Sequence, residues 1–151
     1  MMQLAPVKTL QRIFAETRNI AVVGLSPKTN RPSYQVALYL QQAGYRIIPV
    51  NPGQTEILGE PCYPDLQSIT ELVDVVDIFR RPEQVEPVVL DAIAIGVKVV
   101  WMQQGIVNVE AATIAEQAGL TVIMDRCMKV DHMQYAIQKP EDRRQNSEPG
   151  T

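Results

Sequence analysis

The chain has 151 residues, of which 46% are hydrophobic and 21% are charged, and its formal net charge is -3. This size and composition are typical of one globular domain with its own core, so two compact domains are not expected. The longest apolar runs, such as 20–25 and 97–102, fall far short of the roughly 20 residues that span a bilayer, which excludes a membrane-spanning protein. Residues 1–8 lack the pattern of an export signal, and we therefore expect a cytoplasmic protein.

Charge is unevenly distributed along the chain. Residues 1–50 carry six basic residues and one acidic residue, whereas residues 51–125 carry three basic and twelve acidic residues. This distribution argues against a general nucleic-acid-binding face, which needs many phosphate contacts, but it allows a local anion site near the N-terminal third. The two cysteines, Cys62 and Cys127, cannot form a disulfide scaffold and belong to no cluster with metal-ligand spacing, so we expect reduced thiols and no metal.

Strands and helices are predicted to alternate along the chain. A short leading helix is predicted over 7–17, because Leu10, Ile13 and Phe14 recur at helical spacing. Near-continuously apolar runs predict five buried strands, at 20–24, 45–50, 73–79, 97–102 and 120–124. Helices are predicted between them over 33–43, 82–95 and 108–118, each followed by a glycine that can end it. Pro87 fits the second of these helices only if it lies in the first turn.

This alternation predicts a single α/β domain with a Rossmann-like, doubly wound parallel sheet of five strands and helices on both faces. The simplest order of the strands in space, numbered along the chain, is 3-2-1-4-5. The stretch 51–66 contains three prolines and two glycines and is expected to be a long loop, and long loops are often functional. We expect the folded domain to cover 1–138 and the polar residues 139–151 to be a disordered tail.

Ligands of open parallel sheets bind outside the carboxyl ends of the strands, so the residues that follow each strand form the candidate site. The first strand is followed by a loop of small residues, Gly24–Ser33, which enters a helix where free backbone N–H groups and the helix dipole favour phosphate. Lys28 and Arg31 add positive charge to this loop. We therefore predict phosphate binding here, in preference to an ordinary solvated loop.

The loop does not match the usual dinucleotide fingerprint. Ser26 stands where GxGxxG needs its second glycine, and Thr29 stands where it needs the third. The second strand ends in Val50-Asn51-Pro52 instead of the acid that binds the ribose hydroxyls of NAD. The GxxxxGK[ST] pattern of P-loop proteins is absent as well, so the expected ligand is a different phosphorylated nucleotide.

The later strands end in further polar residues. Arg80 and Arg81 follow the third strand, where they can stack on adenine or bind phosphate, or else form a solvated surface pair. Trp101 is expected in the core, because aromatic side chains are mostly buried. Cys127 follows the fifth strand, but a catalytic thiol there would need contact with His132, the only histidine. No pair of carboxylates recurs at the strand ends, so no acid–base set is evident.

Taken together, these segments resemble a known family. The motifs that carry the resemblance are Ile20-Ala-Val-Val-Gly-Leu-Ser26, Lys28 with Arg31-Pro32, Ile48-Pro-Val-Asn-Pro52, Val75-Val-Asp-Ile-Phe-Arg80, Trp101-Met-Gln-Gln-Gly105 and Met124-Asp-Arg-Cys127. In this order, from about Ile13 to His132, they are similar to the small stand-alone CoA-binding domain proteins of bacteria and archaea, which are themselves similar to the CoA-binding domain of the succinyl-CoA synthetase alpha subunit. The resemblance implies a Rossmann-like fold that holds CoA or an acyl-CoA at the carboxyl edge of the sheet.

The resemblance also implies roles for individual residues. The CoA phosphates would be held by the turn of Gly24, Leu25 and Ser26, with Lys28 and Arg31 nearby. The nucleotide would be bordered by Asn51 and Pro52, and the adenosine or pantetheine would be flanked by Phe79, Arg80 and Arg81. The path toward the thiol end would be lined by Gln104, Gly105, Arg126 and Cys127. The chain matches no ligase domain or phosphorylated-histidine segment of the synthetase relative, so that reaction is not transferred.

The leading hypothesis is therefore a binding or regulatory module for a small nucleotide ligand, CoA or an acyl-CoA. We expect it to be a monomer or a homodimer, with no nucleic-acid and no membrane partner. A rival hypothesis is a CoA-dependent thiol or acyl-transfer enzyme in which Cys127 acts on a bound thioester or disulfide. An NAD-responsive sensor is a third and weaker hypothesis, because Asn51 replaces the expected acid.

Overall fold

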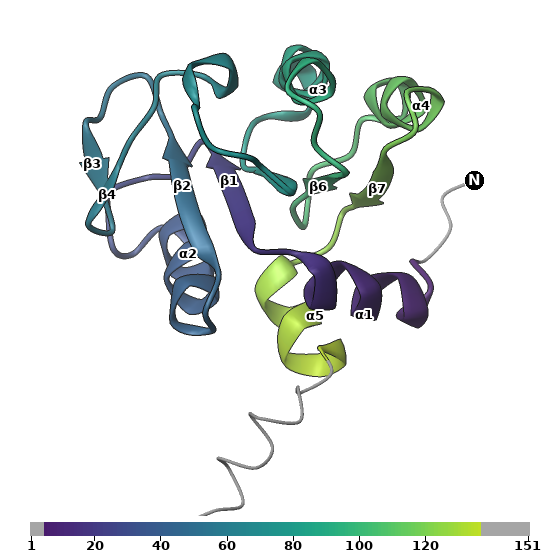
Figure 1. The fold of residues 1–151 in the computed structure, drawn as a ribbon, viewed down its shortest axis with the longest axis horizontal. Helices are drawn as coiled ribbons and strands as arrows, with labels where there is room; N and C mark the ends of the chain where they lie inside the picture. Colours follow the sequence, from purple (N-terminus) through teal and green to yellow (C-terminus); the bar gives the residue numbers. More distant parts are fainter. Residues whose placement is uncertain (1–4, 137–151) are drawn as a thin grey trace, which may run out of the picture.

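The main sheet of the computed structural model, which describes residues 5–136, contains five parallel strands (Figure 1). In chain order they are β1 (Asn19–Val23), β2 (Arg46–Val50), β5 (Val75–Ile78), β6 (Val99–Met102) and β7 (Thr121–Met124). The helices of the described residues are α1 (Val7–Glu16), α2 (Pro32–Gln42), α3 (Val85–Ala94), α4 (Val109–Gln117) and α5 (Met128–Tyr135). Two short strands, β3 (Glu56–Ile57) and β4 (Glu60–Pro61), form a separate hairpin, and the 3-10 turns are η1 (Leu66–Ser68) and η2 (Pro82–Gln84).

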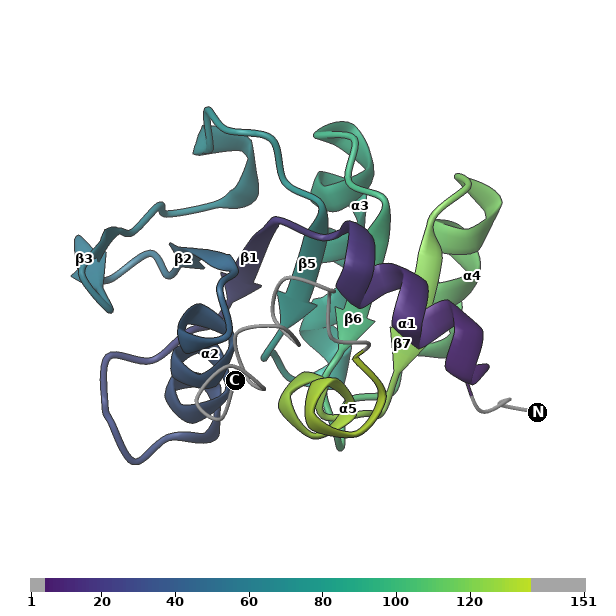
Figure 2. The same cartoon turned by 60° about the horizontal axis from the view of Figure 1, so that its bottom comes forward.

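Helices cover both faces of this sheet (Figures 1 and 2). On one face α1, α2 and α5 pack against strand residues that include Ile20, Val22 and Trp101. On the other face α3 and α4 pack against residues that include Ala21 and Val23. Successive side chains of a strand point to opposite faces, so a strand covered on both faces needs an apolar residue at nearly every position. The predicted doubly wound α/β architecture is therefore confirmed.

The strands lie in the order β2-β1-β5-β6-β7. The predicted order 3-2-1-4-5 agrees with this order except for one strand. It places the third segment, 73–79, outside the second strand, whereas β5, which lies within that segment, pairs with β1. The place outside β2 is taken by a single parallel bridge between Val50 and Tyr63. Pro49 explains why no longer strand pairs there, because its carbonyl accepts the Tyr63 N–H at 3.0 Å but proline has no N–H to donate.

The four predicted helices are present as α1 to α4 with small shifts, and α5 follows β7 as a further helix. Pro82 opens the 3-10 turn η2 instead of α3 itself, and Pro87 lies in the first turn of α3, as the prediction required. The expected loop 51–66 contains the β3–β4 hairpin, whose turn residues Leu58 and Gly59 both have the positive φ of a type I′ turn. The predicted tail 139–151 lies outside the described residues. Among residues 5–136, no helix has both the length and the apolar character that crossing a bilayer demands.

Candidate functional site

The sheet changes direction between β1 and β5, and this junction is where a doubly wound sheet binds its ligand. The loops after these two strands touch at Gly24 and Phe79. Gly24 has φ +87°, and a Cβ built on it would lie 2.1 Å from the Phe79 carbonyl oxygen. Only glycine fits both the backbone conformation and the contact, so Gly24 brings the two walls of the junction together.

Hydrogen bonds order the loop between β1 and α2. The Ser26 N–H donates to Ser33 Oγ at 3.0 Å, and the Lys28 N–H donates to Ser26 Oγ at 3.1 Å. The Arg31 N–H then donates to the Lys28 carbonyl at 3.1 Å, which closes a turn that carries both cations. No side chain of the described residues caps the start of α2, and Pro32 occupies its first turn, so the remaining N–H groups of that turn are available to an anion.

The end of β2 fastens this loop to the sheet. Asn51 Nδ2 donates to the Leu25 carbonyl at 2.9 Å, and Asn51 Oδ1 accepts the Gly53 N–H at 2.9 Å. The Leu25 side chain is fully buried in the core, so only its backbone is available to a ligand. Pro52 is exposed beside Asn51. The predicted residues Leu25 and Asn51 are therefore brought together, and the Asn51 amide holds the loop in place.

Four cations of the candidate site make no ion pair within the described residues: Lys28, Arg31, Arg80 and Arg81. Three of them are exposed, and Arg80 is half-buried. A partly desolvated guanidinium without a carboxylate partner is a group that an anionic ligand can satisfy. The edges of the β1–β5 junction therefore combine a close backbone contact with free positive charge.

Arg126, a further predicted site residue, is already paired. Its Nε donates to Asp131 Oδ2 at 2.6 Å and its Nη2 donates to Asp131 Oδ1 at 2.8 Å. Asp131 is 3% exposed, and the bidentate contact raises the Arg126 pKa above its usual value. Arg126 thus stabilises a buried carboxylate, and its charge is less available to a ligand than that of the four unpaired cations.

The ends of β6 and β7 are held by local hydrogen bonds. The Gly105 N–H donates to Asp125 Oδ1 at 2.7 Å, and Trp101 Nε1 donates to the Arg126 carbonyl at 2.8 Å. Trp101 is fully buried, as the sequence predicts. Gln104 is exposed. The neighbouring Gln103, which sequence analysis missed, is buried, and its Oε1 accepts the Met128 N–H at the start of α5 at 3.0 Å.

The two reactive side chains near β7 are not hydrogen-bonded to each other within the described residues. Cys127 is half-buried at the start of α5. His132 Nδ1 lies 2.8 Å from the Tyr39 hydroxyl oxygen, and its ring meets Phe14 and Tyr45 edge to face. Burial lowers the His132 pKa below its ordinary value of 6.5. His132 therefore belongs to an aromatic cluster that joins α1, α2 and α5.

Asp77 is a buried acid that sequence analysis overlooked. It lies in β5 opposite Val22 of β1 and Trp101 of β6 and is fully buried, and neither carboxylate oxygen has a hydrogen-bond partner among residues 5–136. Burial raises its pKa well above the ordinary value of 3.8. The signal in the sequence is the single acid inside the otherwise apolar segment Val75–Ile78. Its carboxyl group is thus expected to be protonated under conditions in which exposed acids are ionised.

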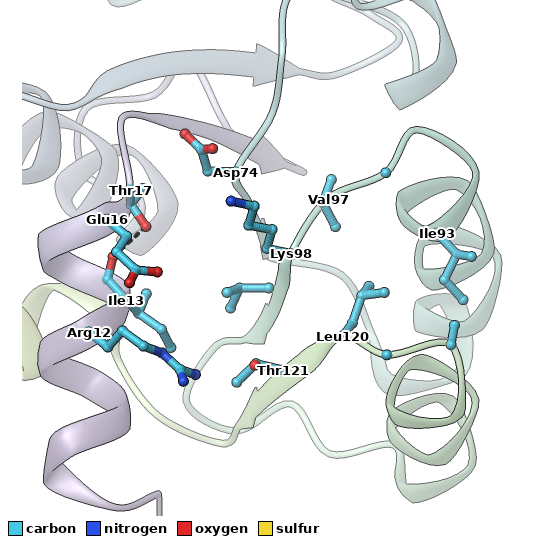
Figure 3. A pocket seen from close by; sticks show the side chains of 14 residues that line it. Arg12, Ile13, Glu16, Thr17, Asp74, Ile93, Val97, Lys98, Leu120 and Thr121 are labelled. Carbon is cyan, nitrogen blue, oxygen red and sulfur yellow. Dashed lines mark hydrogen bonds between the residues drawn. The ribbon is translucent and has the colours of Figure 1, made fainter.

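A cleft of about 560 Å³ lies at the opposite, amino edge of the sheet. Figure 3 shows side chains of both signs around it, among them Arg12, Glu16, Asp74 and Lys98. Asp74 Oδ2 accepts the N–H groups of Arg18 and Asn19 at 3.0 and 2.9 Å, so this acid fixes the entrance to β1. The cleft contains none of the predicted site residues. In the described part of the chain, no group of three or more His, Cys, Asp or Glu side chains is placed to hold a metal ion.

Comparison with known proteins identifies relatives of the whole described fold. The family model described as "CoA binding domain" matches residues 18–133. The chain is 43% identical to the uncharacterized protein YneT of Bacillus subtilis over 123 residues, which cover 82% of this chain and 91% of YneT. A solved structure of a hypothetical protein from Pyrococcus horikoshii OT3 is similar with a TM-score of 0.84 and 37% identity, covering 89% of this chain and 99% of that one. Acetate–CoA ligase I (ADP-forming) of Archaeoglobus fulgidus is 25% identical over 139 residues, which cover 85% of this chain but only 20% of the ligase.

Proposed function

This chain belongs to the CoA binding domain family, and from that premise we propose that it binds coenzyme A or an acyl-CoA at the carboxyl edge of its sheet, as a binding or regulatory module. The observation that carries the proposal is the charge at the β1–β5 junction. Lys28 and Arg31 on one loop and Arg80 and Arg81 on the other are free of ion pairs within the described residues, in a chain whose net charge is -3. CoA is a polyanion with a diphosphate and a ribose 3′-phosphate, so its charge complements these loops.

The diphosphate of the ligand would bind at the first turn of α2. The uncapped N–H groups there and the positive end of the helix dipole favour a phosphate, and the hydrogen bond from the Ser26 N–H to Ser33 Oγ orders the loop beside them. Asn51 stands where NAD-binding folds place an acid, and its Oδ1 already accepts the Gly53 N–H. These contacts favour CoA over NAD as the ligand.

The arm of the ligand would extend along the edge of the sheet. From β1 to β7 there are three strand spacings, or roughly 14 Å, and the pantetheine arm of CoA is long enough to cover such a distance. Gln104, Gly105 and Cys127 then lie along its path. Cys127 has no hydrogen-bonded base in the described residues, and the chain matches about a fifth of the related acetate–CoA ligase, so the proposal stops at binding.

Isothermal titration of the purified protein with CoA, acetyl-CoA and NAD, at one fixed salt concentration, tests the proposal. We expect saturable binding of CoA or acetyl-CoA and weaker binding of NAD. The double variant Arg80→Gln/Arg81→Gln should weaken CoA binding by about tenfold or more, because a charged hydrogen bond between a guanidinium and a phosphate contributes strongly to the binding free energy. The matched control Arg12→Gln/Lys98→Gln removes the same charge at the opposite edge and should leave the affinity unchanged. Absence of CoA and acetyl-CoA binding at millimolar concentration would refute the proposal.

A further inference from the structure

The main sheet ends in two different edge strands, β2 on one side and β7 on the other (Figure 1). An edge strand presents unpaired N–H and C=O groups, and proteins usually protect it with proline, with charge or with a covering segment. β2 has all three. Pro49 supplies no N–H, and Arg46 places a charge at the start of the strand. Tyr63 covers the outer side, because its N–H donates to the Pro49 carbonyl at 3.0 Å and its carbonyl accepts the Asn51 N–H at 2.9 Å.

β7 has none of these protections among residues 5–136. Its sequence, Thr121-Val-Ile-Met124, contains no proline and no charged residue, and no further strand pairs with its outer side in the described part of the chain. The neighbouring strands β5 and β6 are buried at every position, whereas Thr121, Val122 and Met124 are only partly buried. β7 is therefore the unprotected edge of the main sheet.

The backbone groups on the outer side of β7 belong to Val122 and Met124. The Thr121 N–H donates to the Lys98 carbonyl at 3.0 Å, so Thr121 directs its backbone groups toward β6. Successive residues of an extended strand direct their backbone groups to opposite sides, so the N–H and C=O groups of Val122 and Met124 point away from the sheet. No partner for these groups lies among the described residues.

The unpaired stretch of β7 is closed at both ends. On one side the Leu120 N–H donates to the Ala115 carbonyl of α4 at 3.0 Å. On the other side Asp125 has a φ of +63°, so the chain turns out of the strand there. A long extended peptide would therefore find only Val122 and Met124 to pair with. A strand of the same length is a better match, and β7 of a second copy is such a strand.

An antiparallel pair of β7 strands satisfies all of these outer groups at once. If the pair is centred on Ile123, Val122 of one copy lies opposite Met124 of the partner subunit, and such a hydrogen-bonded pair exchanges both of its N–H···O=C bonds. A two-fold axis repeats this pair, so every outer group of both copies is bonded. Because residues 121–124 carry no charge, the second copy meets no like charge along the strand.

We propose that the chain forms a homodimer in which the two β7 strands pair antiparallel, centred on Ile123, and join the two main sheets into one continuous sheet. Antiparallel pairing directs the carboxyl edges of the two sheets to opposite ends of the dimer, so the two candidate ligand sites stay separate and open. The dimer does not depend on the proposed ligand. Titration with CoA and measurement of the oligomeric state can therefore fail independently.

Sedimentation equilibrium of the full chain, from low to high micromolar concentration, tests for the dimer. We expect a dimer that dissociates on dilution and a thermal midpoint that rises with protein concentration. In hydrogen exchange followed by NMR, the amides of Val122 and Met124 should be protected in the dimer and lose this protection on dilution. The Ile123 amide, which faces β6, should stay protected at every concentration and serves as the internal control. A chain that is monomeric at every concentration overturns the proposal.

Two single variants test whether β7 forms the interface. Val122→Pro removes an outer N–H but keeps the N–H groups that face β6, and an edge strand tolerates proline at such a position. It should weaken dimerisation by about tenfold or more, because each copy loses a hydrogen bond of the interface. The control Leu72→Lys changes a leucine that is 84% exposed outside β7 and should leave dimerisation unchanged.

Two double variants test the register. In Val122→Lys/Met124→Lys each new lysine lies opposite a lysine of the second copy, so the dimer should be lost. In Val122→Lys/Met124→Glu each lysine lies opposite a glutamate, so this variant should dimerise at least about tenfold more tightly than the first. Circular dichroism checks that each variant is folded.

The remaining results also decide the proposal. A folded Val122→Pro variant that dimerises as tightly as the unmodified chain places the interface elsewhere and overturns it. Equal dimerisation of the two double variants overturns the register centred on Ile123. If a variant does not fold, hydrogen exchange of the Val122 and Met124 amides in the unmodified chain decides, because that measurement needs no substitution. Amides without protection in a dimeric chain overturn the proposal.

Discussion

Replacement of Gly24 by alanine tests the contact at the centre of the proposed site. The new Cβ would lie 2.1 Å from the Phe79 carbonyl oxygen, whereas a real Cβ contact begins near 3.0 Å, so one of the two backbones must move by most of an ångström. Neither can move freely. The Gly24 N–H donates to the Val50 carbonyl at 2.9 Å, and the Phe79 N–H donates to the Val23 carbonyl at 2.8 Å.

The expected cost has two parts. An L-residue in the left-handed region costs about 1–2 kcal/mol. Displacement of a well-packed backbone contact adds about 1–3 kcal/mol. The variant should therefore lose about 2–5 kcal/mol, a large fraction of the roughly 5–15 kcal/mol that stabilises a typical domain. Because the β1 loop moves, CoA binding should weaken as well.

Urea unfolding of Gly24→Ala and Gly44→Ala separates the two parts. Gly44 also has positive φ, at +107°, but a Cβ there would meet no atom of residues 5–136 within 4 Å, so this control carries only the backbone cost. We expect the urea concentration at the midpoint of unfolding to fall much further for Gly24→Ala than for Gly44→Ala. The slope of the unfolding free energy against urea concentration should stay the same. Equal losses of stability in the two variants would refute the argument from the Phe79 contact.

Three further predictions concern buried charge. The pKa of Asp77 is raised above 3.8 by burial, so the folded state holds this proton to a higher pH than the unfolded state does. The stability of the unmodified chain relative to Asp77→Asn should therefore fall as the pH rises above 3.8, by up to about tenfold in the unfolding constant per pH unit. A difference between the two proteins in urea unfolding that does not change with pH would contradict this prediction. The pKa of His132 is lowered below 6.5, so its neutral form stabilises the fold fully above that pH, and the stabilisation is lost as the pH falls below it. The melting temperature should therefore depend less on pH in His132→Gln than in the unmodified chain between pH 8 and 5. An equal pH dependence of the two melting temperatures argues against this effect. Arg126→Leu leaves the buried Asp131 carboxylate unpaired and should lower the free energy of unfolding in urea by about 3–5 kcal/mol. The control Arg46→Leu breaks an exposed ion pair and should lower it by about 1 kcal/mol or less. Equal losses in the two variants would contradict the argument that burial of the carboxylate sets the cost.

Much of the fold was predictable because its signals are local. A strand covered on both faces needs apolar residues at most positions, and β1, β2, β5, β6 and β7 all coincide with runs of that kind, although Asn19 and Arg46 begin two of them and Asp77 lies inside β5. Glycine and proline mark the boundaries, as in the first turn of α3, where Pro87 is accepted. The order of the strands depends on contacts between distant residues, and there the prediction needed the correction that β5 lies beside β1. Pro49 indicates in the sequence that its strand lies at the edge of the sheet, because a residue without an N–H favours an edge strand.

The position of the candidate site was predictable for a similar reason. Parallel strands carry their ligands at their carboxyl ends, so the residues after each strand could be named without a structure. Their partners could not be named. Whether a cation is free depends on which acids the fold brings near it: Arg126 meets Asp131, whereas Lys28 and Arg80 meet no carboxylate in the described residues.

The sequence by itself determined the five strands of the main sheet, four of the helices, the parallel arrangement and the family, because these follow from local periodicity and from motifs in a set order. The tertiary structure alone decided that Gly24 must meet Phe79, that the Asn51 amide fastens the loop, and that Asp77 has no hydrogen-bond partner in the part of the chain that the structure describes. Each of these depends on distances between residues far apart in the chain. Burial and pairing, which set the charge available to a ligand, arise only when the chain is packed.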